Sequence, residues 1–106
     1  LRVMFLGFNV SPEHQVEGQP RNPLADVRVR EAMTRALDIP AITQTVMRGL
    51  TQPIHTLIAP EVLGYDASLA TPRVTADPAA ARRLLAEAGF PEGFAIGFDC
   101  PNDRFV

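Results

Sequence analysis

The side chains with the greatest capacity for chemistry in this sequence are two histidines and one cysteine. His14 lies in a polar stretch and His55 lies between prolines, and neither has a second residue at a spacing typical of metal ligands or of an activated nucleophile. Asp99 precedes Cys100 directly, but neighbouring residues of a strand point to opposite faces, so these two side chains cannot act together. The sequence therefore predicts no catalytic residue, no metal site and no enzyme.

The charge pattern argues against nucleic acid as a partner. The 106 residues include 12 acidic and 10 basic side chains, all the basic ones being arginine, for a formal net charge of -2. Four arginines between positions 28 and 48 could form a basic patch, but acidic residues between positions 26 and 38 interleave with them and neutralise it. The Gly-rich loops of nucleotide binders are absent from the sequence, and we expect no cofactor.

Size and composition predict one small domain with a real core. The chain is 46% hydrophobic, which suits one core but not two at this length. A single cysteine, Cys100, excludes an internal disulfide framework. The sequence contains no apolar run of about 18 residues that would span a membrane, and no basic-then-apolar leader precedes Leu1. If the protein is exported, its signal is expected outside this chain.

Two capped helices are expected to follow one another between Asp26 and Leu50. Asp26 is a good N-cap for the first helix. Asp38 can cap the second helix, with Pro40 tolerated in the first turn and Gly49 as a left-handed stop. Apolar residues recur on one face of each helix, at Val29, Ala32, Met33, Ala36 and Leu37 in the first and at Ile39, Ile42, Val46, Met47 and Leu50 in the second.

A third helix is predicted near the end of the chain. Asp77 is its N-cap, Pro78 occupies the first helical position, and Gly89 with Phe90 closes it. We expect Phe90 to pack back onto the final turn. The core-facing side is predicted to comprise Ala81, Leu84, Leu85 and Ala88.

Two strands are expected, one at each end of the chain. Residues 3–10 are apolar on both faces, as in a strand buried within a sheet, and residues 94–100 alternate between larger and smaller or polar side chains. Because a central strand needs neighbours on both sides, we expect residues 1–106 to be a single partial domain of a larger protein. Residues 11–23 are predicted to be a polar, mobile linker. Residues 51–76 are predicted to be a long loop that either wraps over the surface or lines a pocket.

Several motifs in fixed order resemble one protein family. They are the stretch from Asp26 to Ile42, followed by Gly49-Leu50, Pro53, Pro60, Gly64-Tyr65 and the block from Asp77 to Phe90. Together they resemble the extracellular (periplasmic) solute-binding proteins of family 5 of ABC transporters, the dipeptide, oligopeptide and nickel-binding type. The resemblance runs from about Phe8 to Pro101. The chain departs from the usual pattern at Ile39-Pro40, where members usually carry a charged residue after the capping Asp, and in its longer polar linker.

The resemblance implies both a fold and a function. The fold would be an α/β fragment of the C-terminal lobe of a two-lobed periplasmic-binding-protein-like (class II) fold, with three main helices and at least two strands. The function would be that of the substrate-binding component of a bacterial ABC importer, which captures a peptide-like solute non-covalently by lobe closure and delivers it to the membrane permease. The location would be periplasmic or extracellular, with or without a lipid anchor.

The resemblance also suggests residues that contact the solute. Phe5 matches a position where members often present an aromatic ring, and Met47 matches a position near the ligand in some members. Both residues also fit the core pattern of their own elements, so packing in the core is the alternative for each. His55 is a remote candidate as a nickel ligand, since a nickel-binding member could use histidine.

A second class of function stays open at this point. A protein-protein interaction or sensor module with no transport role predicts an exposed apolar patch on a stable monomer. A severed lobe predicts instead that the isolated chain self-associates through exposed sheet edges.

Overall fold

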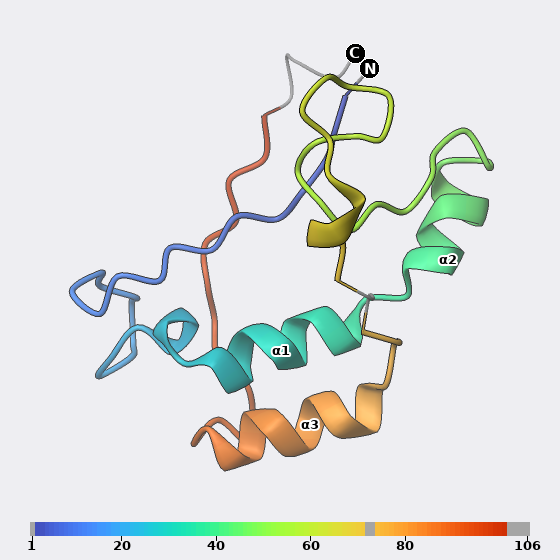
Figure 1. Ribbon diagram of the computed structural model, residues 1–106. Helices are drawn as coiled ribbons and strands as arrows, with labels where there is room; N and C mark the ends of the chain where they lie inside the picture. Colours follow the sequence, from blue (N-terminus) through green and yellow to red (C-terminus); the bar gives the residue numbers. More distant parts are fainter. Residues whose placement is uncertain (1, 72–73, 102–106) are drawn as a thin grey trace.

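The computed structural model describes residues 2–71 and 74–101, and its regular elements are all helical (Figure 1). The two longest are the α-helices α1 (Val27–Ala36) and α3 (Pro78–Glu87). The shorter ones are η1 (Pro23–Ala25), α2 (Ile39–Ala41), the π-helix η2 (Ile42–Val46) and η3 (Ala67–Leu69). None of the helices in the described part is long and apolar enough to cross a membrane.

The expectation of an α/β fold with at least two strands was wrong for the part of the chain that the structure describes. Residues 3–10 and 94–100 have no strand assignment, and no backbone ladder joins the described residues of these segments to a neighbour. A strand is defined by its partner, because its N–H and C=O groups bond to the next strand and not within the segment. Side chains expected to be buried are accordingly exposed, among them Met4, Phe5 and Leu6 near one end and Phe98 near the other.

Helices α1 and α3 lie side by side and antiparallel (Figure 1). The core lies where α1 begins and α3 ends. Its buried cluster consists of Leu24, Val29, Ala88 and Phe90, with Phe8, Met33, Leu85 and Phe94 packed against it. Each helix contributes small or branched side chains, which lets the two axes approach closely. The predicted first and third helices are therefore confirmed, together with much of the apolar face assigned to each.

The predicted caps of both long helices are also present. The carboxylate of Asp26 accepts from the backbone N–H of Arg28 at 2.9 Å, and that of Asp77 accepts from the N–H of Ala80 at 3.0 Å. After α3, Gly89 takes a positive φ of 93° and the N–H of Phe90 donates to the carbonyl of Leu85 at 2.8 Å. This bond folds Phe90 back onto the last turn, as predicted.

The second predicted helix forms with its cap but not with its predicted buried face. Asp38 caps it by accepting from the N–H of Ala41 at 2.9 Å. Beyond Ala41 the bonds widen to the π pattern, in which the N–H of Met47 donates to the carbonyl of Ile42 at 3.0 Å. In this register Thr43 is buried while Val46 is 69% exposed and Leu50 is 86% exposed. The predicted apolar stripe assumed α spacing throughout, and the wider turn breaks it.

The two long connections each contain local structure. Residues 11–20 fold into two turns, closed by the N–H of His14 on the carbonyl of Ser11 and by the N–H of Gln19 on the carbonyl of Val16. The connection at 51–76, described apart from residues 72 and 73, contains η3, whose first turn is capped by Asp66.

Candidate functional site

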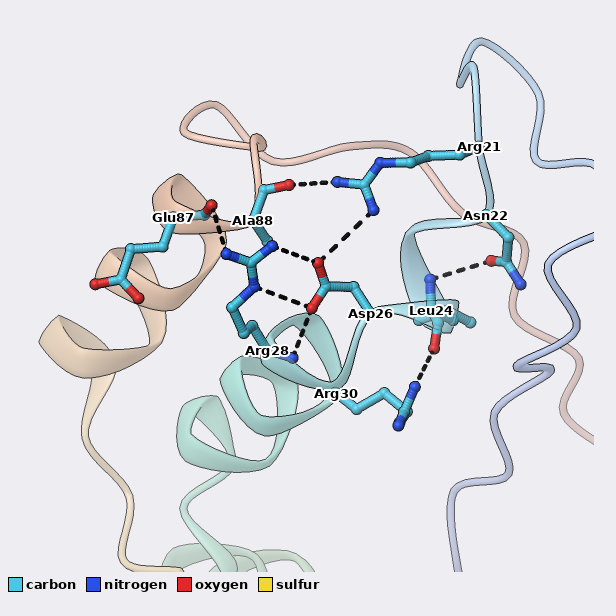
Figure 2. A network of polar contacts seen from close by, with 8 residues as sticks. All are labelled: Arg21, Asn22, Leu24, Asp26, Arg28, Arg30, Glu87 and Ala88. Atoms are coloured by element: carbon cyan, nitrogen blue, oxygen red, sulfur yellow. Dashed lines mark hydrogen bonds and ion pairs between the residues drawn. The ribbon is translucent and has the colours of Figure 1, made fainter.

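The most connected group of polar side chains lies where α1 begins and α3 ends (Figure 2). We call Arg21, Asp26 and Arg28 the arginine clamp. Asp26 stands at its centre: one carboxylate oxygen accepts from Nε of Arg28 at 3.1 Å, and the other accepts from Nη2 of Arg28 at 2.8 Å. Nη1 of Arg21 lies 3.7 Å from the second oxygen. A single carboxylate therefore caps α1 and holds two guanidinium groups.

Both arginines reach from Asp26 to the carbonyl end of α3. Nη1 of Arg28 donates to the carbonyl of Glu87 at 2.9 Å, and Nη2 of Arg21 donates to the carbonyl of Ala88. The last carbonyls of a helix have no partner within the helix and carry partial negative charge, which favours cations there. The clamp thus joins the positive end of α1 to the negative end of α3.

The electrostatics of the clamp are those of a structural ion pair. The hydrogen bonds from the side chain and then the backbone of Arg28 lower the pKa of Asp26 to about 2, against the opposing effect of burial. The same side-chain bond to Asp26 raises the pKa of Arg28. A carboxylate with both oxygens occupied and a pKa this low is a poor proton acceptor near neutral pH. The clamp fixes geometry and does not offer acid-base chemistry.

Asn22 organises the segment that leads into the clamp. Its side-chain amide donates to the carbonyls of Asn9 at 2.8 Å and Ser11 at 2.9 Å, while its oxygen accepts from the N–H of Leu24 at 3.1 Å. The residue is buried, and these bonds satisfy the amide. Asn22 therefore closes the loop of residues 9–22 and caps η1 at the same time.

Two shallow depressions border the clamp. The smaller has a volume of about 260 Å³ and is lined by Pro12, Arg21, Asn22, Ala25 and Asp26. The larger has a volume of about 490 Å³, and its lining includes Arg21, Phe90 and Glu92. Both open widely to solvent, whereas small-molecule sites usually bury most of the ligand surface. Neither depression contains Phe5 or Met47 among its lining residues.

The two predicted solute-contact residues come from separate elements. The Phe5 side chain is 68% exposed on the extended segment that leads towards the core. Met47 is half-buried at the end of η2, with its N–H bonded to Ile42. Phe5 therefore does not pack in the core formed by the described residues, and Met47 is partly covered.

The residues with potential for chemistry remain scattered. His14, His55 and Cys100 are exposed. Among the described residues, no group of three His, Cys, Asp or Glu side chains could hold a metal ion. His55 therefore has no set of neighbouring ligands within that part of the chain.

Comparison with known proteins decides the family. The model of "Bacterial extracellular solute-binding proteins, family 5 Middle" matches residues 1–106. The chain belongs to this family. The resemblance drawn from the capped helices and the later motifs is confirmed.

Curated relatives of the family differ in what their names say they bind. The chain is 36% identical over 96 residues to the dipeptide-binding protein of Escherichia coli, covering 91% of this chain and 16% of that protein. It is 31% identical over 98 residues to heme-binding protein A of Haemophilus influenzae, covering 92% and 16%. It is 32% identical over 75 residues to the glutathione-binding protein GsiB of Escherichia coli, covering 71% and 14%. No solved structure matches the chain significantly.

This chain spans about a sixth of the length of the first two relatives.

The sequence did not predict that Arg21 and Asn22 organise this site. The Asn22-Pro23 pair is a turn signal that could have pointed to Asn22. Nothing local marks Arg21, since its bond to Ala88 joins residues 67 positions apart.

Proposed function

We propose that this chain is part of the solute-binding component of a bacterial ABC importer. The component captures a peptide-like solute without covalent chemistry, closes its lobes around it and delivers it to the membrane permease. The match of the family model to all 106 residues carries the proposal. The names of two relatives support a peptide-like solute, because dipeptides and glutathione share amide bonds and free carboxylates. We propose that the component lies outside the cytoplasmic membrane and that it binds the solute without catalysing a reaction.

Phe5 and Met47 are proposed to contact the solute. An aromatic ring and a thioether both offer apolar surface without charge, so they suit the side chains of a peptide and not its termini. The exposed ring of Phe5 and the partly exposed side chain of Met47 support this role. The charged ends of the solute would be held by residues outside this chain.

A thermal-shift screen of the full-length protein that carries this sequence tests the proposed function. A solute that binds the folded state alone raises the melting temperature. We expect a selective rise with dipeptide or glutathione pools and none with sugars. A rise with heme alone would contradict the peptide proposal, and no rise with any pool, in folded and ligand-free protein, would contradict solute binding.

The 106-residue chain is the control for this screen. It holds at most part of a cleft, so we expect no tight peptide binding by calorimetry. We also propose that it self-associates, although the described residues form no sheet whose edge could mediate this. Exposed apolar side chains such as Leu50, Leu63 and Phe98 are the surface available for association. Sedimentation velocity would detect it, and a monomer across the accessible concentrations would contradict it.

Substitution of the proposed contact residues gives a sharper test. Phe5→Ala and Met47→Ala in the full-length protein are each expected to weaken solute binding about tenfold, since each removes one apolar contact. Phe98→Ala and Met4→Ala are matched controls, because these side chains are of the same types and are exposed in this chain. Calorimetric titration measures all four. Equal losses in variants and controls, or no loss in either, would contradict a specific contact.

A further inference from the structure

The segment from Asp38 to Leu50 carries three features that do not agree with one another. Its sequence predicts an α-helix, with an N-cap at Asp38 and a C-terminal glycine at Gly49. Its backbone has the π pattern from Ile42 to Val46. Its end contains Arg48 at a φ of 52°, a non-glycine residue in the left-handed region. π turns inside helices are rare and frequently occur at functional sites.

The hydrogen bonds show how the register is set. The N–H of Met47 donates to the carbonyl of Ile42, and the N–H of Gly49 donates to the carbonyl of Thr43 at 2.8 Å. An α-helix that ends at the same glycine would instead direct the N–H of Gly49 to the carbonyl of Val46 in a Schellman motif, or to that of Thr45 in an αL motif. In that arrangement Arg48 would have ordinary right-handed angles, because Gly49 alone would take the left-handed conformation.

The two registers present different apolar surfaces. One turn brings residue i over residue i+5 in a π-helix and over residue i+4 in an α-helix. The observed register therefore places Ile42 over Met47. The α register would align Ile42 with Val46, a side chain that is largely exposed here.

We propose that Asp38 to Leu50 is a two-register helix that converts between the observed π form and an α form. The left-handed Arg48 disfavours the π form, and in the α form the exposed side chain of Val46 would lie on the same face as Ile42, one turn away. A molecule that binds either surface shifts the equilibrium towards the register that presents it. The proposal does not depend on the solute-binding function.

Substitution at Arg48 tests the proposal, because glycine and alanine remove the same charge and differ in their tolerance of a positive φ. Arg48→Gly should favour the π form relative to Arg48→Ala, with the ratio of π to α form about fivefold or more higher in the glycine variant. Scalar couplings across hydrogen bonds, measured by NMR in the labelled 106-residue chain, identify the acceptor of the Gly49 N–H. We expect Thr43 as the acceptor in Arg48→Gly and, compared with that variant, an increased share of Val46 or Thr45 in Arg48→Ala.

The same acceptor in both variants and in the parent, whether Thr43, Thr45 or Val46, would overturn the proposal. A thermal unfolding curve of each variant shows whether the variant is still folded. If Arg48→Ala unfolds, relaxation dispersion on the parent chain decides instead. Exchange confined to residues 42–50 would then support two registers, and a flat profile there would overturn them.

Discussion

Phe90→Ala is expected to lower the free energy of unfolding of the chain by about 3–5 kcal/mol, the usual loss for a buried Phe. The ring belongs to the buried cluster with Leu24 and Val29. It meets Phe94 edge to face with 5.1 Å between ring centroids, and the guanidinium of Arg21 lies over it at 5.1 Å. A small domain has a total stability of about 5–15 kcal/mol, so this one change removes much of it.

Urea unfolding followed by circular dichroism measures the effect. Phe98→Ala is the matched control, since it deletes the same ring from a position that is 71% exposed. We expect a change of less than about 0.5 kcal/mol in the control. Equal losses in the two variants would mean that Phe90 does not lie at the centre of the core.

The elements that could be predicted from the sequence are those with local causes. Helices α1 and α3 each have an acidic N-cap and an apolar face, and all of these signals lie within one short stretch. Gly89 and Phe90 add a helix end that depends on backbone conformation at a single residue. Such signals can be recognised without knowing what the helix packs against, although its stability depends on that packing.

The strands could not be predicted safely, because alternation shows how side chains would face and not which segment would pair with them. Residues 3–10 have the composition of a buried strand, yet they have no neighbouring strand among the described residues. The stripe from Ile42 to Leu50 failed for a related reason. Periodicity assumes one helical spacing, and a single π turn shifts every later residue to another face.

Only the local part of the arginine clamp could be predicted from the sequence. Asp26 was recognisable as a cap, and its bond to the N–H of Arg28 spans two positions. Its partners at the end of α3 are distant in sequence, since the bond from Arg28 to Glu87 spans 59 positions. Short spacing rules do not report contacts of this kind. Phe5 and Met47 were suggested by family resemblance and stay predictions.

The acid stability of the chain should depend on Asp26. Its folded pKa of about 2 lies below the ordinary value of 3.8, so the unfolded state binds the proton more readily. The stabilisation is therefore fully present above about pH 4 and is lost as the pH falls towards 2. At neutral pH we expect about 1–2 kcal/mol, less than the full shift implies, because both arginines are half-exposed and screened by solvent.

Asp26→Asn isolates this charge, because Asn remains a good N-cap while it loses the ion pair with Arg28 and Arg21. Urea unfolding at pH 7 and pH 2.5 should show a destabilised variant at pH 7 and a much smaller difference from the parent at pH 2.5. Asp66→Asn is the matched control: bonds from Ser68 also lower the pKa of Asp66, but it caps a single exposed turn. A loss in Asp26→Asn that is equal at both pH values would assign the clamp's contribution to shape and not to charge.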